Sequence, residues 1–150
     1  MSSQNHSLSQ KSTKNVPLIL VVDDNEDNLL YACGSLDLLE LQHIVAKNPQ
    51  AAIDIAMDKQ PDAILLDIVM PGMDGIEVMQ TLKRHHLTNH IPIIAVTGLA
   101  LPSQQEEIFK GGCDDYLCKP YLIEELEEKL TLYLDFDLVN SSTGNDRSAT

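Results

Sequence analysis

The sequence predicts an α/β protein in which a parallel sheet of five strands is covered by five helices. Five short apolar runs alternate along the chain with stretches whose apolar residues recur at helical spacing. This alternation is typical of a parallel sheet with helices on both faces and right-handed crossovers. Two of the apolar runs also end directly in carboxylates, Asp23-Asp24 and Asp67. Ligands of such sheets bind beyond the carboxyl ends of the strands, so these residues indicate a site.

The first unit is a buried strand followed by a capped helix. Residues 18–23 are apolar up to Asp23, which is typical of a strand buried on both faces. Asn25 and the two acidic residues behind it are typical of a helix N-terminus, where they accept backbone N–H groups and favour the helix dipole. We expect this helix to end near Leu39. Its inward residues should be Leu29, Leu30, Cys33 and Leu36.

The second unit has a weaker strand and a clearly marked helix. Residues 42–46 are partly polar, so we place this strand at an edge of the sheet. Asn48-Pro49 is typical of an N-cap followed by proline in the first helical position, and the helix should run to Lys59. Its inward residues should be Ala52, Ile55 and Ala56.

The third unit contains the most apolar strand, residues 62–67, which enters a loop rich in proline and glycine directly after Asp67. Asp74 can cap the next helix, from Gly75 to about His85. We expect that helix to face inward with Ile76, Met79 and Leu82.

The last two units complete the alternation. The fourth strand is expected at residues 91–96, with Pro92 at its start, where a missing N–H group is tolerated. A polar helix from Ser103 to Lys110 should then end at Gly111-Gly112. The fifth strand, a turn and the final helix are expected at residues 115–118, 119–120 and 123–134, the helix facing inward with Ile123, Leu126, Leu130 and Tyr133 or Leu134.

Length and composition indicate one globular domain at residues 17–135. The 150 residues include 43% hydrophobic and 22% charged residues, which is typical of a soluble protein. Residues 1–16 are polar and should form a disordered lead, and residues 136–150 should form a flexible tail. No apolar run is long enough to span a membrane or to serve as a signal peptide, so we expect a cytoplasmic protein with no membrane partner.

The charge and the cysteines exclude other classes of protein. A formal net charge of -13 repels phosphate backbones, so we expect no nucleic-acid partner. The three cysteines, Cys33, Cys113 and Cys118, form no C-x-x-C pair and are expected to be free thiols.

Two buried strands that each end in carboxylate predict an acidic pocket, and such a pocket needs a cation. Carboxylate oxygens are hard ligands, which makes Mg²⁺ the expected ion. A carboxylate such as Asp67 can also attack phosphorus and form an acyl phosphate, which is a known form of covalent catalysis. We therefore predict that Asp67 is a nucleophile rather than a helix cap.

Four motifs in this order resemble the receiver domain of two-component response regulators, in particular the single-domain receivers similar to chemotaxis regulators. The resemblance covers residues 17–135. It implies the flavodoxin-like, doubly wound fold with strand order 2-1-3-4-5, which places the first and third strands side by side. The motifs are Asp23-Asp24, Asp67 with Met70-Pro71-Gly72-Met73-Asp74-Gly75, Val96-Thr97-Gly98, and Tyr116-Leu117-Cys118-Lys119-Pro120.

The resemblance also implies the metal site. Asp67 would be the phosphoacceptor and a Mg²⁺ ligand. Asp24 would bind Mg²⁺ directly, Asp23 would act directly or through water, and the backbone carbonyl of Val69 would be a further ligand. The metal would neutralise the carboxylates so that an anionic phosphoryl group can approach.

Other residues of the motifs would serve the phosphoryl group and the output. Lys119 would supply positive charge, and the bond to Pro120 would be cis. Thr97 offers a hydroxyl, and Gly98 leaves room for the phosphoryl group and exposes an amide. Thr97 and Tyr116 would move together on phosphorylation and change the surface of the fourth helix, fifth strand and fifth helix.

By this resemblance the chain is a stand-alone receiver rather than an enzyme acting on other substrates. Its partners would be a sensor histidine kinase or a histidine phosphotransfer protein, and a downstream protein target. It would act as a monomer or as a phosphorylation-linked dimer. Val69 and Leu99 are apolar at positions that flank the phosphoryl group in the family, which favours a long-lived phosphoryl aspartate.

Three other functions can be weighed against the receiver from the sequence. A phosphatase with an aspartyl nucleophile usually has a second acid two residues later, where this chain has Val69. A flavin carrier would need a loop rich in Ser, Thr and Gly after the first strand, whereas residues 24–27 are Asp-Asn-Glu-Asp. A receiver that is never phosphorylated is disfavoured because the acidic residues, Thr97 and Lys119 are all present.

Overall fold

A five-stranded parallel sheet forms the middle layer of the computed structural model, which describes residues 16–70, 73–98 and 102–134. The strand order is β2-β1-β3-β6-β7, and all four pairings are parallel. This is the predicted order 2-1-3-4-5, and the flavodoxin-like fold is confirmed, with β2 at an edge. The strands are β1 (Leu18–Val22), β2 (Gln42–Ala46), β3 (Ala63–Asp67), β6 (Ile93–Thr97) and β7 (Asp115–Cys118).

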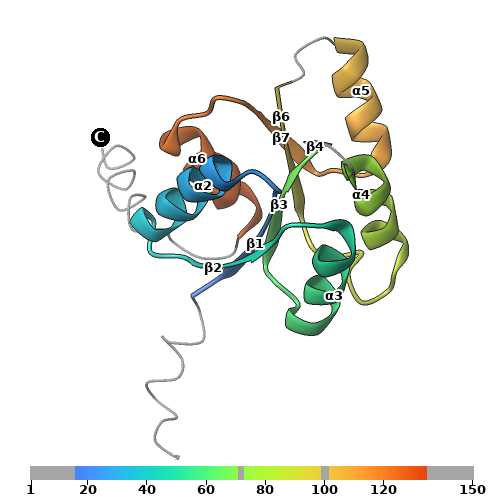
Figure 1. Ribbon diagram of the computed structural model, residues 1–150, viewed down its shortest axis with the longest axis horizontal. Coiled ribbons are helices and arrows are strands. Elements are labelled where there is room, and N and C mark those ends of the chain that lie inside the picture. The colour runs from blue at the N-terminus through green and yellow to red at the C-terminus, as the bar shows by residue number, and fades with distance from the viewer. Residues whose placement is uncertain (1–15, 71–72, 99–101, 135–150) are drawn as a thin grey trace, which may run out of the picture.

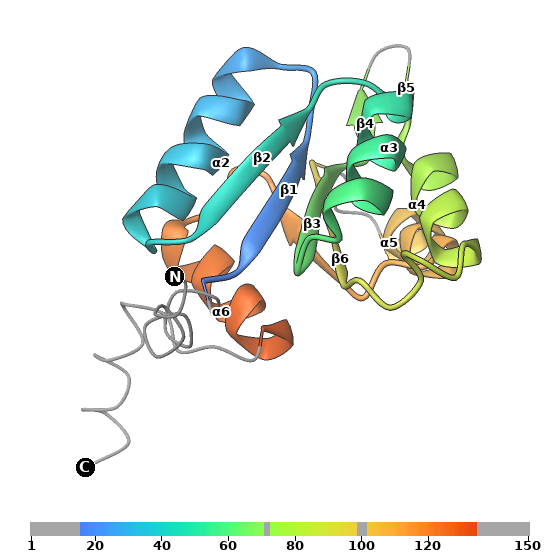
Figure 2. The ribbon, with the colours of Figure 1, turned by 90° about the horizontal axis from the view of Figure 1, so that it is seen from below.

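Helices cover both faces of this sheet (Figures 1 and 2). On one face lie α2 (Glu26–Leu38) and α6 (Ile123–Tyr133). On the other face lie α3 (Pro49–Lys59), α4 (Gly75–Arg84) and α5 (Pro102–Gly111). The three central strands, β1, β3 and β6, are buried almost throughout, which explains why their sequences are apolar nearly to the last residue.

Two hydrophobic clusters hold the layers together. Along β1 the side chains alternate: Ile19 and Val21 pack against α2 and α6, whereas Leu20 and Val22 pack against α3, α4 and α5. Each cluster contains 16 buried residues, so neither face of the sheet is open to water. Burial of this apolar surface is the main stabilising contribution to the fold.

The three predicted helix caps are confirmed. The side chain of Asn25 accepts a hydrogen bond from the backbone N–H of Asn28 at 2.9 Å, and that of Asn48 accepts one from Ala51 at 2.8 Å. Asp74 caps α4 through the backbone N–H groups of its second and third residues, at 3.0 and 3.3 Å. These caps satisfy N–H groups that have no partner within the helix.

The prediction that Leu30 faces inward was wrong. Leu30 is 72% exposed, whereas Leu29, Ala32 and Leu36 are buried. Successive helical residues are about 100° apart, so Leu30 cannot share the inward face that is defined by Leu29 and Leu36. Cys33 is only half-buried.

The loop after β3 contains a short hairpin that the sequence did not predict. It consists of β4 (Val69–Met70) and β5 (Met73–Asp74), which pair antiparallel. Strands of two residues are too short to show an alternating pattern. The fourth strand of the main sheet also begins later than predicted, at Ile93 instead of residue 91.

Several predictions fall outside the described residues. They concern the disordered lead except Val16, the tail from residue 136, Pro71-Gly72 of the third-strand loop, and Leu99. Among the helices that the structure does describe, none has the length and apolar character needed to cross a membrane.

Candidate functional site

Three neighbouring strands bring polar side chains to one edge of the sheet. Asp23 directly follows β1, while Asp67 and Thr97 are the last residues of β3 and β6. Because β3 lies between β1 and β6 in the sheet, these carboxyl ends meet at the same edge. All three side chains are buried, and Asp67 is only 3% exposed. A cluster of buried polar groups at this edge is a candidate site of chemistry.

Lys119 joins the cluster from the segment after β7. Its Nζ lies 3.3 Å from Oδ2 of Asp67, and its backbone N–H donates to the carbonyl of Thr97 at 2.8 Å. The peptide bond between Lys119 and Pro120 is cis, as the resemblance implied. The lysine side chain is 29% exposed, so this ion pair is largely shielded from water. Shielding strengthens the attraction between the two charges.

The Asp67 carboxyl group has an unusual acidity. Burial, and after it the nearby negative charge of Asp23, raise its pKa to about 6, although Lys119 opposes both effects. The backbone N–H of Val69 donates to Oδ1 of Asp67 at 3.3 Å and also favours the charged form. Such a shift is typical of functional sites as well as of structural ion pairs, so the geometry must decide between them.

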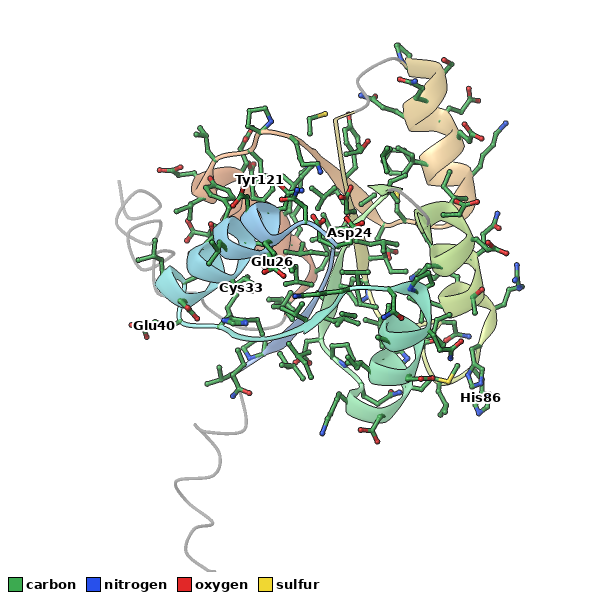
Figure 3. All side chains as sticks on the ribbon, in the orientation of Figure 1. Asp24, Glu26, Cys33, Glu40, His86 and Tyr121 are labelled. Carbon is green, nitrogen blue, oxygen red and sulfur yellow. The ribbon has the colours of Figure 1, made fainter. Side chains whose placement is uncertain are left out.

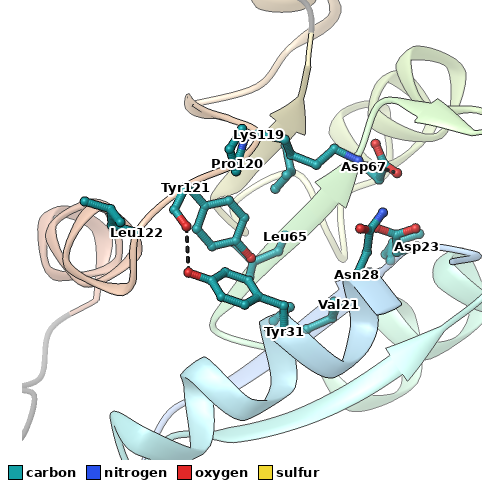
Figure 4. A pocket seen from close by; sticks show the side chains of 13 residues that line it. Val21, Asp23, Asn28, Tyr31, Leu65, Asp67, Lys119, Pro120, Tyr121 and Leu122 are labelled. Carbon is teal, nitrogen blue, oxygen red and sulfur yellow. Dashed lines mark hydrogen bonds and ion pairs between the residues drawn. The ribbon is translucent and has the colours of Figure 1, made fainter. Parts of the chain in front are cut away.

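Only two of the three predicted carboxylates face the same pocket. Asp23 and Asp67 both line a cavity at the ends of β1 and β3 (Figure 4). Asp24, which is labelled in Figure 3, is exposed and does not line this cavity. Asp23 accepts a hydrogen bond from the backbone N–H of Asn25 at 3.0 Å, which holds its side chain in the turn after β1. Within the described ranges, no three His, Cys, Asp or Glu side chains are grouped closely enough to hold a metal ion.

Thr97, Gly98 and Tyr116 lie along β6 and β7. Tyr116 is the register partner of Ala95, two residues before Thr97, so Thr97 and Tyr116 are on the same face of the sheet. Gly98 is exposed, and a Cβ atom added there would meet no described atom within 4 Å. The structure therefore shows no close approach that requires glycine at this position.

The Tyr116 ring lies between two side chains of the neighbouring helices. The Phe109 ring of α5 meets it edge-on, with centroids 5.5 Å apart and planes at 84°. The Nζ atom of Lys129 in α6 lies 5.9 Å from the centroid of the Tyr116 ring and 2.9 Å from Oδ1 of Asp115. Tyr116 is thus half-buried at a surface formed by α5, β7 and α6.

A cavity of about 540 Å³ adjoins the polar cluster (Figure 4). Asp23, Asp67 and Lys119 line one end of it, and Tyr31 and Tyr121 line the other. The hydroxyl of Tyr31 donates to the backbone carbonyl of Tyr121 at 2.6 Å, and the two rings meet edge-on. Sequence reasoning gave neither tyrosine a role. No local pattern shows that α2 and the segment after β7, which are 90 residues apart, enclose a space together.

Comparison with known proteins identifies the class. The response regulator receiver domain matches residues 19–131, and the chain belongs to this family. The polar-differentiation response regulator DivK of Brucella anthropi is 35% identical over 116 residues, which cover 77% of this chain and 94% of that protein. The receiver family is a signalling family of two-component systems, in which phosphorylation and magnesium binding are typical.

Solved structures agree with this assignment. The receiver domain of a sensor histidine kinase from Pseudomonas aeruginosa has a TM-score of 0.73 and 30% identity, covering 78% of this chain and 96% of that one. That structure has a magnesium ion coordinated in its active-site cleft. A crystal structure described as a response regulator of Chloroflexus aurantiacus has a TM-score of 0.75 and 27% identity, covering 80% and 98%.

Proposed function

We propose that this chain is a receiver that accepts a phosphoryl group on Asp67 from the phosphohistidine of a sensor kinase or a histidine phosphotransfer protein. The observation that carries the proposal is the buried Asp67 carboxylate at the end of β3, with Lys119 Nζ 3.3 Å away and Asp23 beside it. An Asp that merely capped a helix would need neither partner.

In the proposed step an Asp67 oxygen attacks the phosphorus atom of phosphohistidine. The new P–O bond forms as the P–N bond breaks, and the imidazole leaves with a proton from solvent. A pKa of about 6 leaves about nine-tenths of the Asp67 side chains ionised at pH 7. Lys119 offers positive charge to the phosphoryl oxygens, and we assign the Thr97 hydroxyl and the Gly98 amide as further donors.

The residues present fit a magnesium ion. Asp23 and Asp67 are hard oxygen donors, and their mutual repulsion contributes to the raised pKa of Asp67. When bound, Mg²⁺ supplies charge neutralisation, which allows an anionic phosphoryl group to approach two carboxylates. We assign Asp24 and the backbone carbonyl of Val69 as the remaining protein ligands on the resemblance to the family.

The proposed output is a change of the surface formed by α5, β7 and α6. Thr97 and Tyr116 share a face of the sheet, and the Tyr116 ring contacts Phe109 and lies beside Lys129. Movement of Thr97 toward a phosphoryl group would open space beside Tyr116, and a displaced ring would change the contacts of both helices. A downstream protein that binds this surface would sense the phosphorylation of Asp67.

The phosphatase alternative is disfavoured by the same geometry. The residue two positions after Asp67 is Val69, whose side chain is apolar and 57% exposed. It cannot act as a general acid. Lys119, the cation closest to Asp67, is paired with the carboxylate itself and supplies charge rather than protons.

The test is phosphorylation with acetyl phosphate and Mg²⁺, followed by intact-mass measurement and peptide mapping. We expect a gain of one phosphate on Asp67, held as an acyl phosphate that both acid and base hydrolyse, and none without Mg²⁺. The Asp67→Asn variant should gain none, whereas Asp58→Asn, at an exposed position of α3, should react like the parent chain. Phosphate on another residue, or an equal gain in Asp67→Asn, would overturn the proposal.

A further inference from the structure

The cavity beside Asp67 has the size and lining of a small-molecule site. Its volume of about 540 Å³ lies within the usual range for such sites. Apolar side chains from three strands and from α2 form its wall, including Val21, Ala32, Leu65 and Val96. We call this space, enclosed between α2 and residues 119–122, the tyrosine cavity (Figure 4).

The Tyr121 side chain is the first sign of a missing partner in this cavity. The residue is only 8% exposed, and its hydroxyl makes no hydrogen bond within the part of the chain that the structure describes. The dashed bond in Figure 4 runs from the Tyr31 hydroxyl to the backbone carbonyl of Tyr121, so it does not satisfy the Tyr121 hydroxyl. Buried hydroxyl groups are normally hydrogen-bonded, and this one faces the cavity.

The Tyr121 hydroxyl is suited to donate a hydrogen bond to a ligand. Burial, and after it the nearby Tyr31, Asp23 and Cys33, raise the pKa of Tyr121 to about 12. The phenol therefore keeps its proton at neutral pH. A ligand that satisfies it would present an oxygen acceptor to the apolar part of the cavity.

The charges at the polar end of the cavity determine which chemical group of the ligand can lie there. Asp23 and Asp67 face Lys119 there, so the polar end has one negative charge in excess when both carboxylates are ionised. A cationic group is favoured over an anion at this end. The apolar wall between the two ends fits an aromatic or aliphatic body.

We propose that the tyrosine cavity binds a small aromatic ammonium compound that carries an oxygen acceptor on its ring. The ring would lie against Ala32 and Leu65, the oxygen would accept from Tyr121, and the ammonium group would face Asp23 and Asp67. Tyr31, which is 44% exposed, would close the mouth through its bond to the Tyr121 carbonyl. Since the ammonium group and Mg²⁺ would share the two carboxylates, the compound would inhibit phosphorylation; this last consequence rests on the proposed function.

The direct test is binding of tyramine to the full chain, measured by backbone amide NMR in Mg²⁺-free buffer. We expect saturable shifts confined to residues that line the cavity, in α2, around Tyr121 and at the ends of β1 and β3. Phenethylamine, which lacks the ring oxygen, should bind about 3- to 10-fold more weakly, which corresponds to one modest hydrogen bond. The anion 3-(4-hydroxyphenyl)propionate has the same ring and the opposite charge, and it should not bind.

Three variants distinguish a change in the cavity from a change in the fold. Ala32→Leu should fill the space and weaken tyramine binding at least about 10-fold. The control on the same helix is Gly34→Ala, which is exposed with no atom within 4 Å of the added Cβ and should bind like the parent chain. Tyr121→Phe should make tyramine and phenethylamine bind equally. Unfolding midpoints and amide spectra show whether each variant is folded.

Several results would overturn the inference. One is the absence of saturable shifts at millimolar tyramine. Others are tyramine binding to Ala32→Leu as tightly as to the parent chain, and binding of the anion as tight as that of tyramine. The last is a crystal structure obtained with tyramine in which only water occupies the cavity. Added Mg²⁺ should weaken tyramine binding, and unchanged binding would place the ammonium group elsewhere and contradict the assignment. The binding measurement does not depend on phosphorylation, so failure of the proposed function would leave it interpretable.

Discussion

Asp67 is buried, whereas the nucleophilic role that we propose for it requires the ionised form, and burial opposes ionisation. The carboxylate is held among apolar strands with a second carboxylate beside it, and one lysine offsets part of the repulsion. A protein selected only for stability would place an uncharged residue there. The retained charge is therefore an argument for chemistry at Asp67, because nucleophilic attack on phosphorus requires the ionised form.

The energetic consequence can be measured by replacing Asp67 with asparagine in Mg²⁺-free buffer. The folded pKa of about 6 exceeds the ordinary value of 3.8, so the folded state holds the proton more tightly. The charge therefore lowers the free energy of unfolding above about pH 6, and this penalty disappears as the pH falls toward 4. We expect Asp67→Asn to gain about 1 to 3 kcal/mol at pH 7 and almost nothing near pH 4. Urea unfolding at both pH values is the measurement, and an equal gain at both would show that ionisation is not the cause.

The proposed role of Lys119 can be tested by removing its positive charge. Removing its ammonium group in Lys119→Ala takes away the cation paired with Asp67, which we propose as a donor to the phosphoryl oxygens. We expect phosphorylation by acetyl phosphate to slow by about 100-fold. The pKa of Asp67 should also rise, because Lys119 holds it down, so the rate profile should move to higher pH. Lys129→Ala, which removes a cation paired with Asp115, is the control; a similar loss of rate there would refute a specific role for Lys119.

At the scale of elements, α4 begins in close contact with the end of β3. A Cβ atom added to Gly75 would lie 2.7 Å from Cα of Ile68 and 2.9 Å from the carbonyl oxygen of Asp67. Both neighbours are backbone atoms, which cannot move aside as a flexible side chain can. The start of α4 therefore fixes the backbone that holds Asp67.

We expect Gly75→Ala to lower the free energy of unfolding by about 1 to 3 kcal/mol and to slow phosphorylation, because the Asp67 backbone must shift. The contrasting variant is Gly34→Ala, where the added methyl group meets no atom within 4 Å in the middle of α2. Alanine is a better helix former than glycine, so that variant should gain up to about 1 kcal/mol. Chemical denaturation of both variants compares them, and equal effects would mean that the contact with β3 does not matter.

The sequence predicts those elements whose signals are local. Apolar runs and caps such as Asn48-Pro49 and Asp74 depend on neighbours within one turn or one strand, and the structure has them where expected. The prediction that Leu30 faces inward was wrong because its apolar side chain was given more weight than its angular position on the helix. The strand order implied by the family resemblance placed the first and third strands side by side, which is why Asp23 and Asp67 could be grouped in advance. The direction of the Asp24 side chain and the cavity beside Tyr121 depend on tertiary packing, and no sequence pattern reports them.

At the scale of the whole molecule, negative charge strongly exceeds positive charge. The net charge of -13 gives the chain an acidic surface, and two of its carboxylates, Asp23 and Asp67, are buried at the same edge of the sheet. Any dissolved cation therefore stabilises the protein weakly by screening, while a cation that binds between Asp23 and Asp67 stabilises it specifically. The two effects differ in how they depend on concentration and on single residues.

Titration with Mg²⁺ separates the two effects. Above the dissociation constant, each tenfold rise in Mg²⁺ concentration should add about 1.4 kcal/mol to the free energy of unfolding, whereas NaCl at equal ionic strength should add much less. Asp67→Asn and Asp23→Asn should lose the Mg²⁺-specific gain but keep the response to NaCl. Asp24→Asn is the informative variant, because Asp24 is exposed and does not line the pocket. If Asp24 is a ligand, the variant must weaken the Mg²⁺ response although it removes no contact with the pocket residues. A full response in Asp24→Asn would remove it from the metal site, and a full response in Asp67→Asn would refute the site itself.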